Sequence, residues 1–388
     1  MKKITGVCLF ALICAAVFAQ AGNTEQEITR TEHFIIFSDP ADGKTLAFEM
    51  EERFSVYNRL FRFNPGNVAG NAAWPLNVRS FRDTDAYNRY VGSQIGSIRP
   101  GAVYLHYQQR DRRELIINRG SAGEGQALSY QAFIQFLRAF VSNPPSWIRE
   151  GFAVFFNNLG FDEDGDLSYE ENLLWLETVK SLEYLPMPGA ILMADVLGMP
   201  DDFQSLAWSI VSFMLNSGKH DYLRTMTDSF MLLSDSKSAE ENSAEVMKHI
   251  FLWNDMEEFD KDYREYLDSR KSFSELLAEG QRAYDIGDTG AAILAFRDAL
   301  DLRPRHFAPR YYLGLLAYEL GDYDTARQYY RSSMQYGADQ ALVLYAMGLN
   351  SAAAGRNSEA VEFLRQAAET APARYREKTQ AIITRLEK

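Results

Sequence analysis

The sequence predicts an α+β domain, built from a small mixed sheet and helices, followed by an all-α solenoid. Strand and helix signals alternate between residues 31 and 118, and helical signals then continue to about residue 266. Between residues 273 and 372 the sequence repeats with a period of 34 residues, which is typical of stacked helical pairs. A chain of 388 residues, 46% of them hydrophobic, is long enough to form both parts.

Hydrophobic periodicity places the elements of the first domain. Strands are predicted over residues 33–38, 77–81, 101–106 and 114–118, and a short helix over residues 85–91. A longer helix over residues 44–61 has an apolar stripe made of Leu46, Met50, Phe54, Tyr57 and Phe61. We expect the β-rich half of the domain to cover residues 22–125 and its helical half residues 126–272.

The first 21 residues have the pattern of a secretory signal peptide. Lys2 and Lys3 precede an apolar stretch, and small residues near its end fit cleavage after Ala19 or Ala21. The alternative, a retained anchor, would need roughly 20 apolar residues to span a membrane, and this stretch is shorter. We therefore expect an exported protein, periplasmic or extracellular, without stable membrane insertion.

Composition excludes several kinds of site and partner. Both cysteines, Cys8 and Cys14, lie within the predicted signal, so the mature chain would have no disulfide and no thiolate site. The formal net charge of -13 repels phosphate backbones and anionic membrane surfaces, so we expect no nucleic-acid partner. Neither a phosphate-cradling glycine loop nor a nucleophile elbow occurs in the sequence.

The 34-residue period rests on three columns of small residues in one register. These columns are Gly280, Gly314 and Gly348; Gly287, Gly321 and Gly355; and Ala292, Ala326 and Ala360. A small residue in the first helix of each repeat lets the second helix approach, and a glycine lets the chain turn between them. The large residues Phe296, Tyr330 and Leu364 are then expected to fill the space between the two helices.

This pattern resembles the tetratricopeptide repeat (TPR), with three copies over residues 273–372 and a polar-faced capping helix over residues 373–388. The resemblance implies a groove lined by the first helix of each repeat. The residues expected to face it are Gln281, Tyr284, Tyr311, Leu315, Tyr318, Tyr345 and Leu349. Two interpretations of the tyrosines stay open: they serve as packing between repeats, or they form a surface that binds a protein or peptide partner.

Three segments of the first domain carry a second resemblance. Residues 31–34, 145–153 and 207–214 are similar to segments of the bacterial peptidase MA-like family, which has the thermolysin-like, or gluzincin, fold. The resemblance covers about residues 30–220. In this family a helix carries His-Glu-x-x-His, and a glutamate in the next helix supplies a third zinc ligand. Glu150 matches that glutamate.

The other zinc ligands have no counterpart in this chain. Tyr130 and Gln131 stand near the position of the missing motif, and no two of the five histidines lie within one helical turn of each other. The resemblance therefore implies a pseudopeptidase with no metal or other cofactor, whose Glu150 pairs with a nearby backbone group or arginine. It also implies that Phe133, Ile134 and Phe136 turn the former metal cleft apolar.

Asp162, Asp164 and Asp166 in an acidic segment resemble the start of a calcium-binding EF-hand loop. The match fails because the glycine falls at loop position 4 instead of 6, and Leu173 stands where the bidentate glutamate belongs. A solvated acidic turn is the preferred interpretation.

Three hypotheses for function remain. The first is an exported, non-enzymatic interaction scaffold in the cell envelope. The second is a metal-independent or residual hydrolase that acts on envelope peptide or glycan through Glu150. The third is a structural subunit of an envelope assembly.

Overall fold

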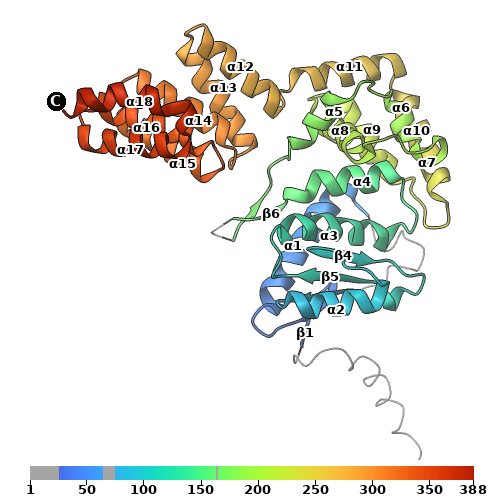
Figure 1. Ribbon diagram of the computed structural model, residues 1–388. Helices are drawn as coiled ribbons and strands as arrows, with labels where there is room; N and C mark the ends of the chain where they lie inside the picture. The colour runs from blue at the N-terminus through green and yellow to red at the C-terminus, as the bar shows by residue number, and fades with distance from the viewer. Residues whose placement is uncertain (1–25, 64–74, 163–164) are drawn as a thin grey trace, which may run out of the picture. The chain divides into compact units, whose positions relative to one another are not determined.

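The computed structural model describes residues 26–63, 75–162 and 165–388, which form two compact units (Figure 1). Unit 1 contains the described residues up to Asn172 together with Leu182–Leu267, and unit 2 contains Leu173–Ser181 and Asp268–Lys388. The predicted signal peptide, residues 1–21, lies outside the described residues, and so does Asp164. Within the described part of the chain, every helix is too short or too polar to cross a membrane.

Unit 1 is built on a mixed sheet with the strand order β1-β2-β3-β5-β4, in which the three central strands are parallel and both edge strands are antiparallel. The strands are β1 (Glu27–Arg30), β2 (Phe34–Ser38), β3 (Leu76–Phe81), β4 (Ala102–Leu105) and β5 (Glu114–Asn118). The last four lie where the sequence predicts strands. β1 was not predicted, because backbone pairing with β2 holds it and most of its side chains are exposed.

Helices cover both faces of this sheet (Figure 1). On one face lie α1 (Gly43–Phe61) and α3 (Glu124–Phe140), and α2 (Thr84–Ile95) covers the other. The apolar stripe predicted for α1 is buried along its whole length, from Leu46 to Phe61. On the opposite face, Tyr87 and Val91 of α2 pack against the sheet.

The helical half of unit 1 packs around α4 (Ser146–Phe155). This helix contacts α3 on one side and α8 (Phe203–Asn216) on the other. At Gly151 of α4 the two helices are so close that a Cβ atom would lie 2.5 Å from the backbone oxygen of Ala207. The other α-helices among the described residues of unit 1 are α6 (Pro188–Leu192), α7 (Ala194–Leu197), α9 (His220–Phe230), α10 (Ala239–Trp253) and most of α11 (Met256–Ser269).

Unit 2 contains three successive helix pairs, as the 34-residue period predicts. The pairs are α12 (Phe273–Asp285) with α13 (Thr289–Leu302), α14 (Phe307–Glu319) with α15 (Tyr323–Gln335), and α16 (Gln340–Ala353) with α17 (Asn357–Thr370). A Cβ atom at Gly280, Gly314 or Gly348 would lie 2.6 to 2.7 Å from the side chain of Phe296, Tyr330 or Leu364 respectively. The predicted role of this glycine column is therefore confirmed.

Two further helices complete unit 2. α18 (Pro372–Leu386) contacts α17 and α16, and so occupies the position of a first helix in a fourth repeat. α5 (Leu174–Ser181) packs against α12, where the Lys180 ammonium contacts Glu275 at 2.8 Å and the Glu177 carboxylate accepts a hydrogen bond from the backbone of Ser274. The segment of α5 was expected in the helical half of the first domain, whereas its contacts group it with unit 2.

Candidate functional site

Glu150 lies where α3, α4 and α8 meet, with only 15% of its side chain exposed. The Tyr130 hydroxyl and the Gln204 amide both donate hydrogen bonds to Oε2, the latter at 2.9 Å. Arg149 donates to Oε1 at 2.8 Å. Both carboxylate oxygens are thus occupied, and one partner is the arginine that the sequence analysis expected.

Hydrogen bonding sets the charge of this cluster. Burial alone would raise the pKa of Glu150, but the hydrogen bonds from Tyr130, Gln204 and Arg149 outweigh burial and lower this pKa below its usual value. Burial, followed by the nearby Glu150 charge, raises the pKa of Tyr130. At neutral pH an ionised carboxylate therefore faces a neutral phenol. A carboxylate with a lowered pKa and three donors is a weak general base.

The other residues near the missing zinc motif take different roles. The Gln131 side chain accepts a hydrogen bond from the backbone N–H of Tyr104 at 3.1 Å, so it ties α3 to edge strand β4. Phe133 and Phe136 are 0% and 2% exposed, so the expectation that they line an apolar cleft is wrong. With about 100° between successive helical residues, these rings face the core, while Tyr130 and Ile134 share the partly exposed side of α3.

The described residues form no ligand cluster for zinc or for calcium. Among the described residues, no three histidine, aspartate or glutamate side chains lie close enough together to hold a metal ion. The acidic segment joins two short strands, β6 (Gly160–Phe161) and β7 (Leu167–Ser168), and the Asp162 carboxylate accepts a hydrogen bond from the backbone of Asp166 at 2.9 Å. Asp162 therefore contributes to the turn of this hairpin.

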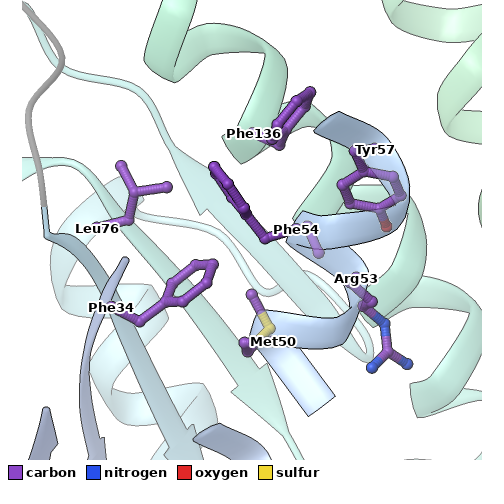
Figure 2. A pocket seen from close by; sticks show the side chains of 8 residues that line it. Phe34, Met50, Arg53, Phe54, Tyr57, Leu76 and Phe136 are labelled. Atoms are coloured by element: carbon purple, nitrogen blue, oxygen red, sulfur yellow. The ribbon is translucent and has the colours of Figure 1, made fainter. Parts of the chain in front are cut away.

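A cavity of about 10 Å³ lies between α1, α3 and the sheet of unit 1. Figure 2 shows Phe34 and Leu76 reaching it from the sheet, and Met50 and Phe54 from α1, with the guanidinium of Arg53 turned away from the rings of Phe34 and Phe54. This volume is about the minimum that holds one water molecule, and the lining is mostly apolar. The cavity therefore marks incomplete packing, with no room for an organic ligand.

The seven groove residues predicted in unit 2 lie on α12, α14 and α16, and each is partly exposed. Several of their tyrosines also make contacts within the stack: the Tyr284 hydroxyl donates to Glu319 at 2.6 Å, and the ring of Tyr345 stacks on that of Tyr375 at 5.0 Å. Burial raises the pKa of Tyr311 to about 12, so its hydroxyl stays protonated at neutral pH. The two interpretations of these tyrosines are thus compatible, since the same side chains pack and remain accessible.

Sequence reasoning missed Gln204 and Arg53. Gln204 reaches Glu150 from a helix 54 residues further along the chain, and nothing in its local sequence indicates this contact. Arg53 is 3% exposed and lies 3.4 Å from both the Ser129 hydroxyl and the backbone oxygen of Leu159. Arg53 directly precedes Phe54, which belongs to the apolar stripe of α1. This position in the sequence could have indicated a buried arginine.

Comparison with known proteins agrees with the repeat assignment. Residues 277–341 match the tetratricopeptide repeat family, which covers the first two repeats and the start of the third. The solved structures similar to this chain include the MamA protein, with 20% identity over 42% of this chain and 91% of that chain and a TM-score of 0.25. They also include the TPR domain of P58(IPK), with 12% identity over 66% of this chain and 59% of that chain and a TM-score of 0.28.

No curated protein matches the chain. The family match shows that the chain carries tetratricopeptide repeats, and this fold supports a role in protein–protein interaction.

Proposed function

We propose that the protein is an exported, non-enzymatic scaffold of the cell envelope, which binds a protein or peptide in the groove of its repeats and keeps unit 1 as a pseudopeptidase. The observation that carries this proposal is the row of partly exposed side chains on three successive first helices: Gln281, Tyr284, Tyr311, Leu315, Tyr318, Tyr345 and Leu349.

The row has the physical properties of a binding surface. Tyrosine and leucine offer a large contact area, and contacts within the stack already restrict several of the tyrosine rings, so little conformational entropy is lost on binding. Because α18 packs as a fourth first helix, it extends the stack and leaves the row formed by α12, α14 and α16 accessible. These features support peptide binding over packing alone.

Support for the pseudopeptidase comes from the contact between α3 and α4. Tyr130 stands near the missing zinc motif and Glu150 matches the family's third ligand, and a hydroxyl–carboxylate hydrogen bond joins the two. The phenol donates a hydrogen bond to the carboxylate of a residue that would otherwise bind a metal, and the neighbouring Arg149 balances its charge.

The hydrolase hypothesis is disfavoured by the same cluster. A general base must be free to accept a proton from water, but both oxygens of Glu150 already accept hydrogen bonds and its pKa is lowered. A Glu150→Gln variant that lost a measurable hydrolytic activity would restore this hypothesis.

Selection from a phage-displayed random peptide library against the immobilised mature protein tests the groove. We expect selected peptides to lose at least tenfold in affinity for a Tyr318→Ala variant, measured by fluorescence polarisation. The matched control is Tyr329→Ala, which removes a partly buried tyrosine from the second helix of the same repeat. Equal affinity for wild type and Tyr318→Ala, or equal losses in both variants, would count against the groove.

A further inference from the structure

A group of arginines lies beside the Glu150 cluster on unit 1. This arginine cluster consists of Arg113, just before β5, Arg138, in the last turn of α3, and Arg149, in the first turn of α4. All three side chains are partly exposed. The partly exposed Tyr104 and His106, from β4 and the residues after it, border the cluster, with the Tyr104 hydroxyl 3.4 Å from Nδ1 of His106.

Hydrogen bonds to the backbone hold the cluster in place. Arg113 donates from Nε to the backbone oxygen of Tyr107 at 2.7 Å and from Nη1 to that of Arg138 at 3.4 Å. Arg138 donates from Nη1 to the backbone oxygen of Ser142 at 2.9 Å. A guanidinium carries five N–H groups, and the hydrogen bonds that Arg138 makes to the described residues engage Nη1 alone. Donors of Arg138 thus remain for a ligand.

The cluster carries more positive than negative charge. Its carboxylates are Glu150, bound to Arg149, and Asp235, which binds Arg110 at 3.3 Å and the backbone of Ser142 at 2.8 Å. Counting Arg110, four guanidinium groups face these two carboxylates, so the local charge is +4 - 2 = +2, in a chain whose formal net charge is -13.

Burial and then the repulsion from the like charges of Arg149 and Arg113 lower the pKa of Arg138. Burial, Arg138 and Arg113 together lower the pKa of His106 to about 4, so its imidazole adds no charge at neutral pH. A bound anion would relieve this repulsion and use the free donors of Arg138, because arginine forms its strongest hydrogen bonds with carboxylate and phosphate oxygens.

We propose that the arginine cluster binds a compact oxyanion, a carboxylate or phosphate group of a ligand, with Arg138 as its main contact and the Tyr104 hydroxyl as a neutral donor. This site lies in unit 1 and is independent of the groove of the repeats. The site would bind the ligand through its charge and shape, without a chemical step.

Isothermal titration calorimetry of the full mature chain with inorganic phosphate and, separately, with succinate tests this proposal at constant ionic strength. We expect saturable binding of at least one anion, and an Arg138→Gln variant should raise its Kd about tenfold or more. Arg89→Gln is the matched control, since it removes the same charge from an exposed position on α2 and should leave the Kd unchanged.

The two anions distinguish the source of the oxyanion. Binding of phosphate alone identifies a phosphorylated ligand, and binding of succinate alone identifies a carboxylate ligand. If Arg138→Gln fails to fold, Tyr104→Phe replaces it, because this change removes one hydroxyl and keeps the ring; it should raise the Kd severalfold. No saturable binding of either anion to the wild-type protein, or a Kd unchanged in these variants, would overturn the proposal.

Discussion

The hydroxyl of Tyr130 on α3 donates a hydrogen bond to the carboxylate of Glu150 on α4. This contact joins two helices within unit 1 and neutralises neither residue, so it depends on the phenol staying protonated and the carboxylate staying ionised. Both conditions hold at neutral pH, because the pKa of Tyr130 is raised and that of Glu150 is lowered. The hydrogen bond between this pair therefore stabilises the packing of α3 against α4.

Replacing Tyr130 with phenylalanine should destabilise unit 1 by about 1.5–3 kcal/mol, because a buried carboxylate loses a hydrogen-bond donor. Urea unfolding of the wild type and the variant measures this difference in the free energy of unfolding. The control is Tyr184→Phe, which removes the same hydroxyl from a residue that is 71% exposed. A Tyr130→Phe variant as stable as the control variant would show that the contact does not stabilise the packing of the two helices.

Glu150 should contribute to the loss of stability in acid. Its folded-state pKa lies below the reference value of 4.5, so the ionised form stabilises the fold above about pH 4.5, and this stabilisation is lost as the pH falls through the folded-state pKa. A Glu150→Gln variant should therefore show a shallower decline in the free energy of unfolding below pH 4.5. Equal slopes for wild type and variant would contradict the assigned pKa.

His106 should affect the free energy of unfolding at higher pH than Glu150 does. Its folded-state pKa is about 4, against a reference value of 6.5, so the unfolded chain binds more protons in this interval and stability falls as the pH drops from 6.5 to about 4. In a His106→Gln variant this part of the decline should disappear. His220→Gln, at an exposed position, serves as the control and should keep the wild-type profile. NMR titration of the His106 ring gives the pKa directly.

A methyl group at Gly314 should destabilise the second repeat by about 1–3 kcal/mol, because the Cβ atom of a Gly314→Ala variant would lie 2.6 Å from the ring of Tyr330. The matched change Gly290→Ala, in α13, meets no atom closer than 3.7 Å and should be neutral or slightly stabilising, since alanine favours a helix over glycine. Thermal unfolding followed by circular dichroism compares the two variants, and equal stabilities would refute the close approach of the helices.

Local patterns predicted much of this architecture. The repeats were predictable because each one is a short segment whose glycine and its large partner are 16 residues apart, as Gly314 and Tyr330 are. The stripe of α1 was predictable because helical periodicity shows directly which side is buried. Edge strand β1 was missed because backbone hydrogen bonds hold it, and these leave no trace in side-chain pattern.

The site was less predictable than the fold. The arginine partner of Glu150 is its neighbour in sequence, but Tyr130 and Gln204 come from two other helices, and only the tertiary fold brings them together. The predicted orientation of Phe133 was wrong, because the resemblance identified the helix but did not show which side of it faces the core. The arginine cluster likewise joins residues of three separate segments of the chain, so composition alone could not indicate it.

The membership of α5 in unit 2 has a consequence for any attempt to divide the protein. The chain leaves unit 1 after Asn172, contributes α5 to the repeats, returns at Leu182 and leaves again after Leu267, so the polypeptide passes between the units three times. No single cleavage can release unit 2 intact, and a fragment that starts at residue 268 lacks Lys180 and Glu177, which contact Glu275 and Ser274. Any transfer of the whole of unit 2 to another protein must therefore carry two separate segments of the gene.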